Sequence, residues 1–179
     1  MLEQPTLTVT SAPNWALGVG DIGSGLILLG CFAFVAALVL GLLRRERLST
    51  VGFVLGAASL FGAFACLTVL FVNNQFEYQY VFSHGDALTE LKYKIAGVWS
   101  GQQGSFLLWA CSSAIFGLLA LRGTGIYRRW FIAPYSLFLA ALCGILAYET
   151  PFGLLKDAQH AGKVLMPSTG TGLAPSLEN

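Results

Sequence analysis

Charge is scarce in this sequence. Only 11% of its 179 residues are Asp, Glu, Lys or Arg, against about 25% in soluble globular domains. By contrast, 55% are hydrophobic and the mean hydropathy is +0.68, so we expect an integral membrane protein. A net charge of +1 gives no reason to expect a nucleic-acid partner. The first residues carry no basic segment, so no cleavable signal peptide is predicted.

Signatures of soluble enzymes are missing as well. There is no GxSxG, no phosphate-binding loop and no HExxH, so no catalytic residue is predicted. The cysteines form no CxxC, which argues against a zinc or thiol-redox site and favours buried free thiols: Cys31, Cys66, Cys111 and Cys143. His84 and His160 could each ligate a metal or haem iron, but a lone loop histidine is more often exposed and inert. No metal site is therefore predicted.

What is present is a set of long apolar runs. A helix rises 1.5 Å per residue, so about 20 residues cross the roughly 30 Å apolar core of a bilayer. No charged residue interrupts these runs, which argues against an ion path through them alone. We predict an all-α integral membrane fold with four transmembrane helices in a domain at 22–148, at residues 22–43, 51–72, 104–121 and 130–148.

The arginines predict the orientation of the chain. All of them fall in the two loops that follow the first and third runs: Arg44, Arg45, Arg47, Arg122, Arg128 and Arg129. Loops rich in Arg and Lys stay in the cytoplasm. The N-terminal tail at 1–21, the loop at 73–103 and the polar tail at 149–179 are then expected on the outer face.

The second run contains Gly52-x-x-x-Gly56. This spacing lets another helix approach closely, although it also arises by chance in glycine-rich membrane chains.

The segment between the second and third runs is longer and more aromatic than a simple connector. Its first part, 73–86, is expected to be extended or irregular. After Asp86, a plausible N-cap, five residues share one helical face, which predicts a short amphipathic helix in the membrane interface: Leu88, Leu91, Ile95, Val98 and Trp99. A loop with fortuitous spacing is the alternative.

The aromatic residues of this segment allow two interpretations. They could form the floor of a site for a flat apolar ligand, or they could be ordinary interface anchors, which composition favours. They are Phe76, Tyr78, Tyr80, Phe82, Tyr93, Trp99 and Trp109. The nearby acids Glu77, Asp86, Glu90 and Glu149 are expected to form weak surface ion pairs with Lys92 or Lys94 at most.

Specific residues of this segment resemble a known family. Tyr80-Val81, Tyr93-Lys94 and the block from Trp99 to Trp109 are similar to the N-terminal region of CcmF-type cytochrome c biogenesis proteins, in the CcmF/CcsA haem-handling superfamily. The block contains Gly101, Gln102, Gln103, Gly104 and Ser105. The similarity continues at Thr150-Pro151-Phe152 and at Gly170, Gly172, Leu173, Pro175, Leu177 and Asn179.

This resemblance implies cytochrome c maturation. Such proteins sit in the bacterial inner membrane, receive haem from a haem chaperone and join it to apocytochrome c on the outer face. Haem is then the cofactor of the complete assembly. The expected partners are the remainder of the haem lyase, the chaperone, apocytochrome c and membrane lipid. Four residues are candidates for contacting haem or shaping a surface for it: Tyr93, Lys94, Trp99 and Trp109.

Two departures from the family pattern limit what the resemblance implies. Gln103 stands where the family often has Glu and Gln102 where it often has His, so an acid or imidazole role is lost there. The family's His-Pro-Pro segment and Trp-rich loop, which carry haem-ligating function, are not in the sequence. The chain is thus expected to be the N-terminal part of a larger haem lyase, truncated or split, and not active alone. A structural or transport subunit of an unrelated respiratory membrane complex is the alternative function.

Overall fold

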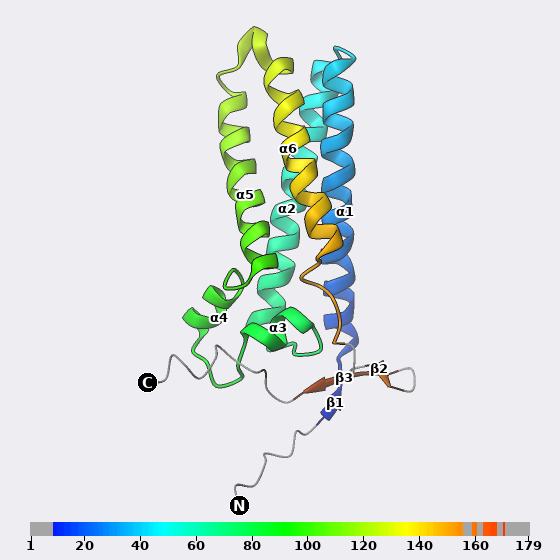
Figure 1. The fold of residues 1–179 in the computed structure, drawn as a ribbon, viewed down its shortest axis with the longest axis vertical. Coiled ribbons are helices and arrows are strands. Elements are labelled where there is room, and N and C mark those ends of the chain that lie inside the picture. Colours follow the sequence, from blue (N-terminus) through cyan, green and yellow to red (C-terminus); the bar gives the residue numbers. More distant parts are fainter. Residues whose placement is uncertain (1–8, 156–158, 161–162, 168–169, 171–179) are drawn as a thin grey trace, which may run out of the picture.

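Long helices dominate the computed structural model, which describes residues 9–155, 159–160, 163–167 and 170. They lie side by side as a bundle (Figure 1): α1 (Asn14–Leu42), α2 (Glu46–Val72), α5 (Gln102–Leu121) and α6 (Arg128–Tyr148). All four are long and apolar enough to cross a membrane. The prediction of an all-α membrane fold is confirmed.

The helices extend beyond the predicted apolar runs. The first begins at Asn14, so it includes Asp21, and the second begins at Glu46. The predicted tail at 1–21 is therefore wrong for residues 14–21, while residues 1–8 lie outside the described part of the chain. Hydropathy marks where an apolar span ends, whereas a helix continues as long as its backbone hydrogen bonds do.

Glycine allows α1 and α2 to pack closely. A Cβ atom on Gly52 would lie 3.1 Å from the carbonyl oxygen of Ala33, and one on Gly56 would lie 2.8 Å from the ring of Phe34. The GxxxG sequence is thus a real helix contact, as one of its two interpretations predicted. The ring of Phe34 meets that of Phe53 edge-on at 5.5 Å, filling the space beside these glycines.

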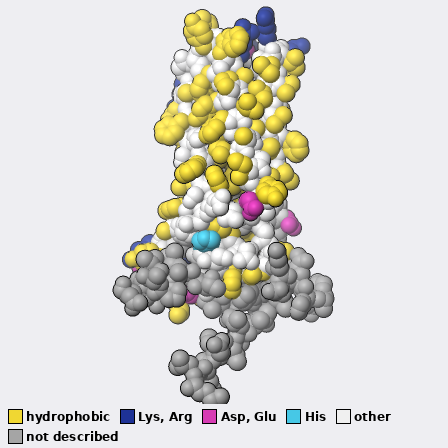
Figure 2. Space-filling model, viewed as in Figure 1, with side chains coloured by type: hydrophobic (Ala, Val, Ile, Leu, Met, Phe, Trp, Pro, Cys, Tyr) yellow, Lys and Arg dark blue, Asp and Glu magenta, His cyan; other side chains and the backbone are white. Residues whose placement is uncertain are grey.

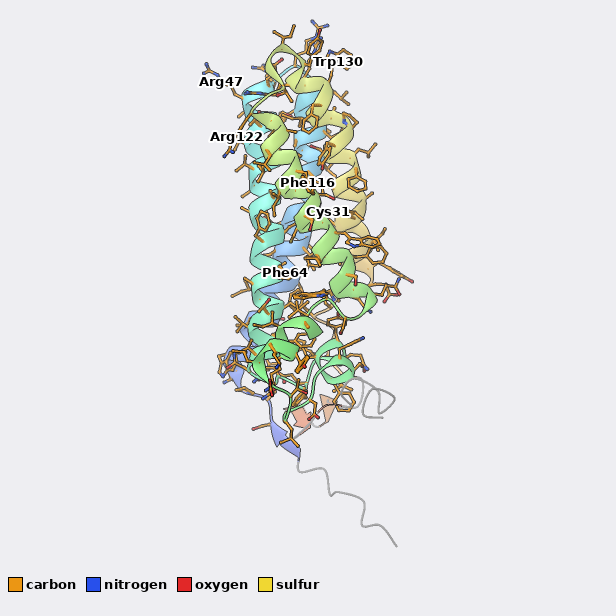
Figure 3. The ribbon with its side chains drawn as sticks, turned by 90° about the vertical axis from the view of Figure 1, so that its left-hand side faces the viewer. Cys31, Arg47, Phe64, Phe116, Arg122 and Trp130 are labelled. Carbon is orange, nitrogen blue, oxygen red and sulfur yellow. The ribbon has the colours of Figure 1, made fainter. Side chains whose placement is uncertain are left out.

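The two ends of the bundle differ in chemistry. The arginine end carries the α1–α2 and α5–α6 connections and all six arginines, and Figure 3 shows Arg47, Arg122 and Trp130 together there. Between the ends, Figure 2 shows a broad apolar belt. The exposed apolar side chains of the long helices include Phe32 and Phe116. The four cysteines are free, as predicted; Cys111 and Cys143 are buried, whereas Cys31 and Cys66 are only partly buried.

The opposite end, called the loop end below, holds the remaining elements (Figure 1). Two short helices, α3 (Gln79–His84) and α4 (Leu91–Gly97), cover the bundle there. Below them lies a small antiparallel sheet of order β1-β3-β2, made of Val9–Ser11, Lys163–Pro167 and Gln159–His160. Residue pairs such as Val9 and Pro167 join segments from the two ends of the chain.

Several local predictions at this end are corrected. The stretch 73–86, expected to be irregular, contains α3. The amphipathic helix begins at Leu91 with Glu90 as its N-cap, because the Asp86 carboxylate instead accepts the amide of Leu88 in a turn, at 3.2 Å. Leu88 is 93% exposed and does not join the helical face. The strands were not predicted: β1 pairs with β3 from the other end of the chain, and β2 is a strand of only two residues that pairs with the neighbouring β3.

Candidate functional site at the loop end

Three aromatic residues of the loop end are core residues. Phe76, Tyr78 and Tyr80 are only 1%, 2% and 4% exposed. The ring of Tyr80 packs edge-on against Phe71 at the end of α2, at 5.6 Å. For these residues both sequence interpretations, a ligand floor and interface anchoring, are wrong, because the segment folds back onto the end of the bundle.

Tyr80 connects α3 to the start of α5. Its hydroxyl donates to the carbonyl oxygen of Val98 at 3.1 Å and accepts from the amide of Gly101 at 3.0 Å. Gly101 is the N-cap of α5 and offers no side-chain cap of its own. Burial raises the pKa of Tyr80, so the hydroxyl keeps its proton and both hydrogen bonds at physiological pH.

The glycines of the motif provide room for this arrangement. A Cβ atom on Gly104 would overlap the Val98 carbonyl and the Tyr80 hydroxyl, and one on Gly101 would overlap the imidazole of His84 and the ring of Tyr80. Both positions therefore require glycine for steric reasons. This explains why the motif has glycine at 101 and 104 without giving either residue a chemical role.

His84 packs against the same tyrosine. Its Nδ1 atom lies 3.0 Å from the backbone carbonyl oxygen of Tyr80, and the two rings are 4.5 Å apart. Since a carbonyl only accepts, Nδ1 carries the proton when the ring is neutral, and Nε2 carries the lone pair. The side chain of His84 is half-buried. Among the described residues no group of three His, Cys, Asp or Glu could hold a metal ion. The side chain of His160 lies outside the described residues.

The four residues predicted to contact haem or shape a surface lie where α4 leads into α5. Tyr93, Trp99 and Trp109 are 53%, 38% and 60% exposed. The ammonium group of Lys94 donates a long hydrogen bond to the backbone carbonyl of Ala87, at 3.4 Å. Within residues 9–155, no ring contact, hydrogen bond or ion pair joins these four side chains to one another, and Trp109 is about 10 Å along α5 from its first residue. We use the name "aromatic corner" for the three exposed rings of this region, Tyr93, Trp99 and Trp109.

The rest of the motif holds this corner in place. The hydroxyl of Ser105 donates to the carbonyl oxygen of Trp99 at 2.8 Å, which fixes the turn that presents the indole. Gln102 and Gln103 are the first two residues of α5, and no hydrogen bond of their side chains is found within the described chain. Their amides are available to a ligand or partner. The ion pair of Glu90 with Lys92, at 2.8 Å, is exposed and contributes little.

The sequence did not identify Glu77 as unusual. Its side chain is 0% exposed, and neither carboxyl oxygen has a hydrogen-bond partner in the described structure. Burial raises its pKa to about 7. The prediction that it belongs to the charged surface is wrong, because its neighbours Phe76 and Tyr78 carry it into the interior. The sequence held no local signal for this burial, because the alternation of aromatic and polar residues from Phe76 to Tyr80 would place Glu77 on the opposite face from the rings.

Segments after α6 complete the loop end. The hydroxyl of Tyr78 donates to the carbonyl of Ala16 at 2.9 Å, and Phe152 packs where a Cβ atom on Gly23 would lie. Gly170 sits so close to the carbonyls of Phe82 and Gly85 that a Cβ atom would overlap them. Two of the segments named for the family resemblance, at 150–152 and at 170, thus contact the loop end, while residues 171–179 lie outside the described chain.

Comparisons with known proteins agree with this resemblance. No family model matches the sequence. The chain is 35% identical to the cytochrome c-type biogenesis protein CcmF of Pseudomonas fluorescens over 178 residues, covering 92% of this chain and 26% of that one. It is 28% identical to the cytochrome c-type biogenesis protein CycK of Rhizobium meliloti over 181 residues, covering 85% and 26%. A solved structure of cytochrome c heme lyase CcmF shares its fold, with a TM-score of 0.62 at 22% identity, over 88% of this chain and 27% of that one.

These matches agree in their extent. The chain spans about a quarter of the length of the curated relatives it matches. The alignment with the relative from Pseudomonas fluorescens covers nearly all of this chain. On these similarities, the chain belongs to the CcmF-type family of cytochrome c-type biogenesis proteins.

Proposed function

We propose that this chain forms the membrane frame and part of the haem-handling surface of a haem lyase that delivers haem to apocytochrome c. Its relatives are named cytochrome c-type biogenesis proteins, and the solved protein that shares its fold is named a heme lyase, which supports this role. The observation that carries the proposal is the aromatic corner. Tyr80, Gly101 and Gly104 hold the turn before α5 rigidly, while the corner itself stays exposed.

The corner is suited to contact rather than to iron ligation. Aromatic faces offer apolar area for a flat macrocycle or for an aromatic side chain of a partner, and fixed turns lower the entropy cost of binding. The partners we propose are the remainder of the haem lyase, the haem chaperone and apocytochrome c. Haem belongs to the complete assembly, and its iron ligands are expected outside this chain.

The proposed orientation places the loop end on the outer face of a bacterial inner membrane, because the six arginines gather at the other end. Single cysteines at Leu88 and Ile126, which are 93% and 82% exposed at opposite ends, form a matched pair. A membrane-impermeant maleimide applied to intact inner membranes should label the cysteine at 88 and spare the one at 126. The reverse pattern contradicts the orientation.

The function is tested in the complete assembly. Trp99→Ala and Trp109→Ala should each lower the level of holocytochrome c at least tenfold at unchanged protein abundance. The matched control is Trp130→Ala, which removes an indole that is 66% exposed at the arginine end and should have little effect. Equal holocytochrome levels in all three variants would mean that the corner is an anchor only. A second measurement uses the 179-residue chain alone. If it binds one equivalent of axially ligated haem, the expectation that the iron ligands lie outside this chain is wrong.

A further inference from the structure

The carboxyl group of Glu77 is the most unusual polar group of the loop end. Its backbone lies in a short extended segment that pairs with the chain just after α6. The carbonyl of Glu77 accepts the amide of Leu155 at 2.9 Å, and the amide of Gln79 donates to the carbonyl of Gly153 at 2.9 Å. Between them, Tyr78 and Leu154 form an antiparallel bridge. We call this pairing the 77–79/153–155 latch.

The side chain of Glu77 is buried directly beside this latch. It is 0% exposed, and both of its oxygens are without a hydrogen-bond partner in the described structure. A carboxylate in such a place would lose its hydration without compensation, which is costly, whereas a neutral carboxylic acid is tolerated far better. The folded loop end therefore accommodates the protonated form.

The charged groups around the latch offer no compensation. Asp21 of α1, Tyr78 and Glu149 at the end of α6 are neutral or negative. His84 at the end of α3 holds its Nδ1 atom against the backbone carbonyl oxygen of Tyr80, at 3.0 Å. Burial is the main cause of the raised Glu77 pKa, and no cation of the described residues contributes to it. The one influence toward the charged form is the dipole of the backbone amide of Glu77 itself, and this N–H is not placed to donate a hydrogen bond to either carboxyl oxygen.

We propose that Glu77 is a proton-binding site that controls the 77–79/153–155 latch. With the proton bound, the acid stays buried and the latch is closed. When the proton leaves to water, the carboxylate must be hydrated, and water reaches it only if the backbone pairing beside it opens.

This inference is independent of the proposed haem function, because it rests on burial and backbone pairing alone. It is tested on the purified 179-residue protein in lipid nanodiscs, by hydrogen exchange of the Leu155 and Gln79 amides between pH 5 and 8.5. After correction for the intrinsic rate, the opening equilibrium should rise about tenfold per pH unit toward pH 7 and then level off. Opening that does not change with pH overturns the proposal.

Matched variants identify the group responsible. Glu77→Gln keeps the shape without the charge and should abolish the pH dependence, whereas Glu90→Gln, which removes an exposed acid, should preserve it. Lys156 follows Leu155 in the sequence. If Lys156→Gln removes the pH dependence as well, the carboxyl group is held as an anion in an ion pair, and the proposal is wrong.

A direct measurement covers the case in which Glu77→Gln does not fold. Infrared difference spectra of the wild-type protein between pH 5 and 8.5 should show the loss of one protonated carboxyl band near pH 7. The absence of any such band overturns the proposal without reference to a variant.

Discussion

The hydroxyl of Tyr80 donates a 3.1 Å hydrogen bond to the backbone carbonyl of Val98, 18 residues later in the chain. Both residues are buried, at 4% and 0% exposure. The bond joins α3 to the turn before α5, and the same hydroxyl accepts the amide at the N-cap of α5. One side chain therefore fixes the position of the motif that carries Trp99.

Tyr80→Phe tests this connection. The variant leaves the Val98 carbonyl and the Gly101 amide without a partner in a buried place, so we expect a loss of about 1–3 kcal/mol of stability. Chemical or thermal unfolding in detergent measures it. Tyr127→Phe, at a side chain that is 67% exposed at the arginine end, is the control and should change stability little. Equal stability of the two variants would show that the Tyr80 bonds are dispensable.

Gly104→Ala tests the steric requirement of the motif. The added methyl group overlaps the Val98 carbonyl and the Tyr80 hydroxyl, so the turn must shift, at a cost of about 1–3 kcal/mol or more. Gly144→Ala is the control, because nothing lies within 4 Å of a Cβ atom there and alanine favours helix. We expect it to stabilise the protein by about 0.5–1 kcal/mol. Thermal unfolding of both variants should give shifts of opposite sign, and a neutral Gly104→Ala would contradict the account.

The stability of the whole fold should depend on pH through Glu77. Its pKa is about 7 when folded and 4.5 in its unperturbed state, so the folded protein binds the proton more tightly. Protonation of Glu77 stabilises the fold fully below pH 4.5. This stabilisation decreases as the pH rises to 7, and above pH 7 it stays at its lower value. The loss is roughly 3 kcal/mol. The difference in unfolding free energy between wild type and Glu77→Gln, followed from pH 4.5 to 7.5, measures it; a flat difference would be inconsistent with a raised pKa.

Gly56→Leu tests the packing of the two longest helices. A side chain there must displace the ring of Phe34, which fills the space between α1 and α2. We expect loss of the compact fold, seen as aggregation or a large drop in melting temperature. Gly25→Leu is the control, since position 25 is open and faces away from the bundle core. Similar behaviour of the two variants would mean that the close approach is unimportant.

Much of the frame was predictable from the sequence. Uninterrupted apolar runs indicated the four spanning helices, since only a helix satisfies its own backbone in a bilayer. The spacing of Gly52 and Gly56 identified a real helix contact. The block from Trp99 to Trp109 pointed to the family. Which side of the membrane each end faces remains a prediction.

Tertiary structure decided the chemistry of the loop end. By itself the sequence determined how much apolar surface each segment has to bury, because that depends only on residue type. Which partner covers that surface was decided by contacts between distant segments: Tyr78 with Ala16, Tyr80 with Val98, and Glu77 with Leu155. The burial of Glu77 and the steric role of Gly104 follow from those contacts. No local pattern encodes them, because a side chain's environment is set by whatever packs against it.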